Sequence, residues 1–123
     1  MNSLGRWGED QAADYLNRQG CQILCRNYTC PYGELDLVAQ QGDVLLLVEV
    51  KARSNRSWET PAQALTPAKR RKLIKTAQIY LQEYSGELQP RFDLIQVFFH
   101  LEHGDPVLDR LDHLPGAFDV SED

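Results

Sequence analysis

The sequence predicts one α/β domain in which helices sandwich a mixed central sheet. Two segments carry apolar residues at helical spacing, and short apolar runs bounded by turn residues lie between and after them. The predicted order is helix, three strands, helix and strand. The core covers residues 3–101, and an irregular acidic tail covers 102–123. A chain of 123 residues can bury about two-thirds of its unfolded surface in one such core.

The first helix is predicted to run through Arg18, and Gly20 ends it. Its apolar residues are loosely at helical spacing: Leu4, Trp7, Ala12, Ala13 and Leu16. Gly5 and Gly8 each cost a helix about 1 kcal/mol relative to alanine. We therefore expect regular helix only from near Gly8.

Three strands follow, at residues 21–28, 33–40 and 44–51. The second alternates in polarity, "QGD" is a turn signal, and the third reads "VLLLVEVK". Consecutive aliphatic residues in that third run indicate a central strand that is covered on both faces.

Thr66 and Pro67 are typical of a helix N-cap and first helical residue. The helix that follows keeps one apolar face, and Ser85-Gly86 ends it. Residues 91–101, "RFDLIQVFFHL", form the last predicted strand. Asp93 within it is interpreted as structural, paired with Arg91 or with a neighbouring strand.

Charge is distributed unevenly along the chain. The formal net charge is −5, yet residues 51–75 hold eight basic residues against one acid, a local charge of +7. Residues 102–123 hold seven acids and one arginine. A polyanionic partner responds to the local field, so the acidic total does not exclude nucleic acid.

The longest aliphatic run, residues 44–48, is too short to span a bilayer, and the first residues carry no secretory signal. A cytoplasmic protein without a membrane partner is expected. Three cysteines, Cys21, Cys25 and Cys30, have no paired spacing and no nearby histidine for a zinc site. We expect reduced, structural thiols.

The end of the third strand is unusual because charged residues follow a core-like run. Side chains alternate across a strand, so Glu49 and Lys51 share a face. A two-residue turn at Gln41-Gly42 would place Asp36 on that face, opposite Leu47 and diagonal to Glu49. Glu34 would then lie directly opposite Glu49, whereas a three-residue turn would put Asp36 on the wrong face.

Three carboxylates and an ammonium at one end of an apolar sheet do not favour folding, because like charges there destabilise one another. A divalent cation would explain them, since it takes carboxylate oxygens and leaves positions for water and phosphate. The simpler interpretation is that Lys51 neutralises Glu49 in a partly solvated pair, worth about 0–1 kcal/mol.

These residues also carry a family resemblance. The chain resembles the YraN family of small bacterial proteins described as predicted endonucleases, within the PD-(D/E)XK superfamily of restriction-endonuclease-like fold. The resemblance covers about residues 5–99, in order and at compatible spacing. The matching pieces are "GRWGEDQAADYL", "RNY", "GELDL", "VEVKAR", Lys69 and "RFDLI".

The resemblance implies a role for each matching residue. Asp36 and Glu49 would bind Mg²⁺, for which Mn²⁺ would substitute, and Lys51 would orient the attacking water. Glu9 matches an acid that archaeal Holliday-junction resolvases of this superfamily place beside the metal. Glu34 is shared with the narrower family and is a further candidate ligand. Leu35, where the superfamily has proline, is a departure that removes no ligand.

The basic block is interpreted as a phosphate-binding surface, with a solvated basic face as the alternative. Lys69 is the best single candidate, because cations beside free N–H groups at a helix N-terminus suit phosphate. The other candidates are Arg53, Arg56, Arg70, Lys72 and Lys75. Trp58 could stack on a base, but we expect it to pin its own loop to the domain.

The sequence therefore predicts a metal-dependent endonuclease that hydrolyses phosphodiester bonds in DNA, including branched DNA such as Holliday junctions. RNA as a substrate and a homodimer stay open. A DNA- or RNA-binding module without cleavage is the alternative, and an interaction scaffold with a fortuitous ion pair is a third.

Overall fold

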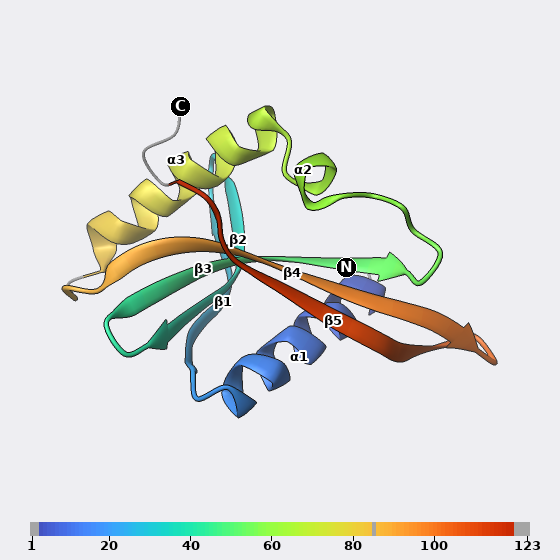
Figure 1. Cartoon of the computed structure of the whole chain (residues 1–123). Coiled ribbons are helices and arrows are strands. Elements are labelled where there is room, and N and C mark those ends of the chain that lie inside the picture. The colour runs from blue at the N-terminus through green and yellow to red at the C-terminus, as the bar shows by residue number, and fades with distance from the viewer. Residues whose placement is uncertain (1–2, 85, 120–123) are drawn as a thin grey trace.

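Helices lie on both faces of a five-stranded sheet in the computed structural model, which describes residues 3–84 and 86–119 (Figure 1). This confirms an α/β domain with a mixed sheet. The elements in chain order are α1 (Ser3–Arg18), β1 (Gln22–Cys30), β2 (Gly33–Gln41), β3 (Val44–Ser54), α2 (Pro61–Ala64), α3 (Pro67–Glu83), β4 (Gln89–Glu102) and β5 (Asp105–Phe118).

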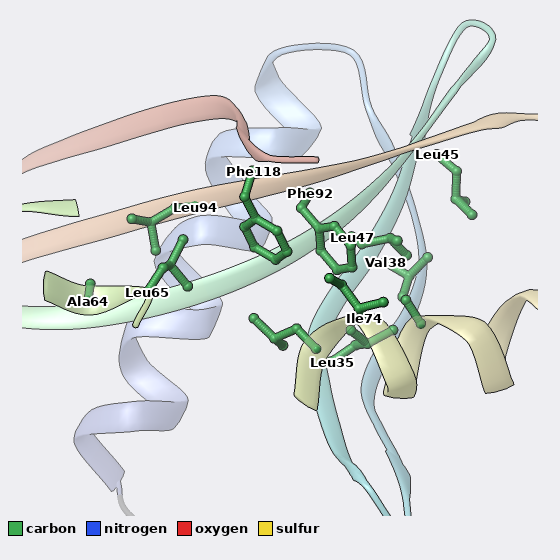
Figure 2. Close-up of a cluster of buried hydrophobic side chains, with 12 residues drawn as sticks. Leu35, Val38, Leu45, Leu47, Ala64, Leu65, Ile74, Phe92, Leu94 and Phe118 are labelled. Carbon is green, nitrogen blue, oxygen red and sulfur yellow. The ribbon is translucent and has the colours of Figure 1, made fainter. Parts of the chain in front are cut away.

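The strands are ordered β1-β2-β3-β4-β5, so the predicted central strand, β3, is in the middle of the sheet. It pairs antiparallel with β2 and parallel with β4, and the segment that holds α2 and α3 makes the crossover that parallel pairing requires. Leu45 and Leu47 of β3 pack into the cluster on the α3 side, whereas Leu46 and Val48 pack into the cluster on the α1 side. Figure 2 shows the first of these clusters, with Ile74 of α3 among its residues.

Helix α1 begins at Ser3, so the expected start near Gly8 is wrong. Gly8 is buried against β3, and a Cβ atom there would lie 3.2 Å from the Cβ atom of Ala52. Glycine thus permits close contact between α1 and β3. This packing offsets its poor helix propensity.

Residues 102–123 were predicted as an irregular tail, and this is also wrong. Residues 105–118 form β5, which pairs antiparallel with β4 at the edge of the sheet. Its burial alternates only weakly, because an edge strand exposes much of its surface, and the acidic side chains remain solvated. Residues 120–123 of the predicted tail lie outside the described residues.

One short helix was not predicted, and the end of another was placed slightly too late. The sequence did not indicate α2, a single turn that Thr60 begins through a reciprocal capping box with Gln63. Thr66 caps α3 as predicted, but α3 ends at Glu83, and Ser85 of the predicted stop lies outside the described residues.

The β2–β3 hairpin has the predicted two-residue loop, but the loop is Gly42-Asp43 rather than Gln41-Gly42. Gln41 pairs with Val44, and Gly42 has the positive φ, +57°, that the first position of such a loop commonly needs. The register therefore moves by two residues and keeps its parity, so Leu47 lies opposite Val38 rather than Asp36.

The three cysteines have free thiols, as predicted. No helix among residues 3–84 and 86–119 is long and apolar enough to cross a membrane.

Candidate active site

The strands β2 and β3 separate at the point where their charged residues begin. Backbone pairing ends at Leu37 and Val48, and beyond it Asp36 Oδ2 accepts a hydrogen bond of 2.8 Å from the Val50 N–H group. A carboxylate thus takes the position of a backbone acceptor. This bond holds Asp36 beside Glu49. The two residues lie directly beyond the last pair of the ladder, whereas the sequence predicted that they would lie diagonal to one another.

Asp36 and Glu49 are both buried, with exposed fractions of 8% and 9%. Burial first, and then the neighbouring Glu49 and Glu9, together raise the pKa of Asp36 to about 9, against the opposing effect of the Val50 N–H group. Without a cation, Asp36 is therefore protonated at neutral pH. A buried acid pair of this kind costs the fold stability, as expected for a site that is kept for function.

Two lysines complete the charged cluster. Lys69 lies in the first turn of α3, where its N–H group donates to the cap Thr66, and its Nζ atom is 2.6 Å from Glu49 Oε2. Although burial opposes it, this contact with Glu49 raises the pKa of Lys69. Burial lowers the pKa of Lys51, and the nearby Lys69 lowers it further. Lys51 is thus the ammonium that loses its proton more readily.

These groups line a pocket of about 350 Å³ between β2, β3 and α3. Its lining residues are Tyr32, Gly33, Glu34, Asp36, Glu49, Val50, Lys51, Lys69, Lys72, Leu73 and Thr76. The pocket therefore brings together six residues that the sequence predicted for the site.

The other two predicted acids, Glu34 and Glu9, occupy different positions relative to the pocket. Glu34 borders the pocket but pairs with Thr29 of β1 and is exposed, so its predicted position opposite Glu49 is wrong. Glu9 of α1 is close enough for its charge to act on Asp36 and Glu34. Burial raises the pKa of Glu9, and a hydrogen bond with Asn27 opposes that rise.

A divalent cation in this pocket would need oxygen ligands that can reach it together. Among the described residues, no three Asp, Glu, His or Cys side chains are placed to hold one ion together. Mg²⁺ needs fewer, because it is commonly bound through one or two carboxylates with water and substrate phosphate. Asp36 and Glu49 fit this requirement, and a cation bound there would favour the ionised form of Asp36, which burial disfavours.

The basic residues of the predicted phosphate surface have different partners. Arg53 pairs with Glu59, and Arg70 donates from Nε to the Leu65 carbonyl at 2.8 Å. Of the remaining cations, Lys72 lines the pocket, Lys75 lies over the ring of Tyr32, and Arg56 is in the exposed loop after β3.

Trp58 in the same loop is 95% exposed. The expectation that it pins this loop to the domain is therefore wrong, since its ring contributes almost nothing to the core.

Sequence reasoning missed Asn27, Tyr32 and Thr76. Asn27 has a positive φ of 55° in β1, and its side chain is hydrogen-bonded to Glu9. The "RNY" piece of the family resemblance could have pointed to it. Thr76 is fully buried, donates to the Lys72 carbonyl at 2.8 Å and lines the pocket. Its position on the apolar face of α3 gave no functional signal.

Comparison with known proteins gives one consistent family. Residues 8–97 match the model of "Uncharacterised protein family UPF0102". A "UPF0102 protein" of Syntrophotalea carbinolica is 50% identical over 96% of this chain and 93% of its own length. Relatives with the same description are 44% identical in Pelotomaculum thermopropionicum, over 94% of each chain, and 42% identical in Chlorobium chlorochromatii, over 97% and 93%.

Proposed function

The chain belongs to the uncharacterised protein family UPF0102, and from that premise we propose that it is a metal-dependent endonuclease acting on DNA. The observation that carries the proposal is the buried pair of Asp36 and Glu49 with Lys51 on the same face of the sheet. The motif spacing supports a restriction-endonuclease-like arrangement similar to that of the Holliday-junction resolvases, so branched DNA is included among the proposed substrates.

Each charged side chain has a distinct role in this proposal. Mg²⁺ held by Asp36 and Glu49 would supply positive charge to the phosphoryl oxygens. Lys51, whose pKa is lowered by burial and by Lys69, orients the attacking water and exchanges a proton with it more readily than a solvent-exposed lysine would. Its ammonium form also stabilises negative charge that develops on the phosphate.

Lys69 and Lys72 give the pocket a phosphate-binding side. Both project from α3 into the pocket that the two acids line. Lys69 is in the first turn of α3, so a phosphate that it binds also lies near the positive end of the α3 helix dipole. The scissile phosphate is thereby placed between α3 and the ends of β2 and β3.

A binding module without cleavage is the second candidate. It is favoured by the lack of a third carboxylate in metal-binding position among the described residues. In that case Lys69 remains paired with Glu49, and the lysines bind the backbone without promoting hydrolysis.

The test incubates purified protein with linear, nicked and four-way-junction DNA and with a matched RNA, in Mg²⁺ or Mn²⁺. We expect cleavage that chelation stops, and a loss of at least about 100-fold in rate in Lys51→Ala and in Asp36→Asn. Asp43→Asn, in the exposed β2–β3 loop, is the matched acid control and should cleave normally.

Cleavage that is unchanged in Lys51→Ala and Asp36→Asn would refute the assignment of the site. Binding without cleavage on every substrate would favour the second candidate. Size-exclusion chromatography with and without junction DNA tests whether two copies pair on the substrate.

A further inference from the structure

A second groove lies beside the candidate active site on the same face of the sheet. It has a volume of about 390 Å³ and is bordered by the loop after β3 and by β4 and β5. Gln96 of β4 lies in its floor and pairs in register with Lys51 of β3 on one side and Asp112 of β5 on the other. Because neighbouring strands are about 4.8 Å apart, the groove begins one strand away from Lys51.

Gln96, which lines this groove, has an unsatisfied side-chain donor. The residue is 5% exposed, and its Nε2 atom is buried without a hydrogen-bond partner among the described residues. Burial of an amide N–H group without an acceptor destabilises a fold, so such a group normally has a reason to persist. An acceptor on a bound ligand would satisfy it once the Gln96 amide turns toward the groove.

The side chains of Trp58 and Phe98 bring aromatic rings to the groove, and the charged residues that line it are paired. The Trp58 ring is 95% exposed at one side, and the Arg110 guanidinium lies 3.9 Å from the centre of the Phe98 ring. Arg110 also donates to Asp112. Glu59, a further lining residue, pairs with Arg53. Because these charges are matched, the groove suits a neutral planar group rather than a free phosphate.

We propose that this groove binds one unpaired nucleobase of a DNA strand whose phosphate lies in the neighbouring active site. Trp58 stacks on the base, and the Gln96 amide donates to an acceptor on its edge. The inference rests on the proposed function for its substrate class, and it narrows that class to DNA with an unpaired or extruded base. An aliphatic ligand would leave Gln96 unsatisfied, so a base with edge acceptors fits better.

The test measures binding in chelator, where cleavage does not contribute. Three otherwise identical duplexes are compared by competition anisotropy: fully paired, with one unpaired base, and with an unpaired abasic residue at the same position. We expect the unpaired base to be bound about tenfold more tightly than the abasic residue and to quench tryptophan emission.

Trp58→Ala and Gln96→Leu should each abolish this preference and leave affinity for the paired duplex unchanged. Trp58 is exposed, so its replacement tests the pocket even if Gln96→Leu unfolds. Lys72→Ala is the matched comparison, because it should weaken binding to all three duplexes alike.

Equal affinity for the unpaired base and the abasic residue would overturn the inference, as would a preference that survives in Trp58→Ala. Either result leaves the nuclease proposal intact if paired or branched DNA is cleaved in Mg²⁺. A preference lost in both variants, with no cleavage of any DNA, would keep the base site and refute the nuclease.

Discussion

At the scale of single residues, the buried acids Asp36 and Glu49 lower the stability of the metal-free fold. Both side chains are buried acids; Glu49 forms an ion pair with Lys69, whereas Asp36 is held protonated at neutral pH. The Val50 N–H group favours the ionised form of Asp36, but burial and the neighbouring acids outweigh it. The metal-free fold should therefore become more stable when Asp36 is replaced by a neutral residue that need not take up a proton on folding at pH 7.

We predict that Asp36→Asn is more stable than the wild type in chelator at pH 7, by roughly 2 kcal/mol, since one pKa unit corresponds to ~1.4 kcal/mol. The asparagine oxygen can still accept from Val50, so the local geometry is kept. Urea unfolding of both proteins in EDTA measures the difference. A substitution that destabilises the protein under these conditions would contradict the strain assigned to this pair.

At the scale of elements, Asp93 connects β4 with β5 and, through a histidine, with α1. Its carboxylate accepts two hydrogen bonds of 2.8 Å from Arg91, one of 3.1 Å from the Gly116 N–H group, and a contact of 2.7 Å with His113 Nε2. The other ring nitrogen of His113 is 2.9 Å from the Tyr15 hydroxyl of α1. This confirms the structural interpretation of Asp93 and explains how an acidic edge strand is fixed to the sheet.

We predict that Asp93→Asn destabilises the protein by about 2 kcal/mol at pH 7, because it leaves Arg91 without its counter-charge. Burial opposes ionisation, but Arg91, His113 and Gly116 hold the pKa of Asp93 below its usual 3.8. The carboxylate's contribution is thus present above pH 3.8 and is lost as pH falls through the lower folded-state value.

Urea unfolding from pH 7 to pH 3 checks this prediction, with Asp105→Asn at the exposed start of β5 as the control. The difference between Asp93→Asn and the wild type should shrink only below about pH 4. A difference that is already absent at pH 7 would show that the network contributes nothing.

At the scale of the whole molecule, opposite charges are separated. The net charge is −5, but residues 51–75 are strongly basic, and Lys69 and Lys72 of α3 line the candidate active site. The acids of β5 lie on an edge strand two strands away from β3. A polyanion that approaches the pocket therefore meets a local field opposite in sign to that of the whole chain.

We predict that DNA binding in chelator weakens linearly with the logarithm of salt concentration, and that Lys72→Ala lowers the slope by about 1, as for the loss of one phosphate contact. Arg18→Ala is the control, because Arg18 pairs with Asp14 on α1, on the other face of the sheet. Anisotropy titrations at several salt concentrations measure both slopes. Equal slopes for Lys72→Ala and the wild type would place the DNA elsewhere.

Local sequence patterns were sufficient for most of the elements. Consecutive aliphatic residues predicted the central strand β3, and Thr66-Pro67 predicted the start of α3. Patterns failed where packing overrides them: Gly8 lies inside a helix because it fits against Ala52. They also failed for β5, since an edge strand needs no continuous apolar face and resembles a solvated tail.

By itself, the sequence determined which residues share a face of each strand, because the alternation of side chains depends only on the local chain. It therefore placed Glu49 and Lys51 on one side of the sheet, whereas the face of Asp36 depended on the length of the hairpin loop. Only the tertiary structure decided which of them meet, since the hairpin loop can shift by one residue, moving the register by two, without changing that parity. It also decided that the Trp58 side chain is exposed and that it lines the same groove as Gln96. The exposure of a loop residue and the hydrogen-bond partners of a buried amide depend on chain segments that are far apart in sequence.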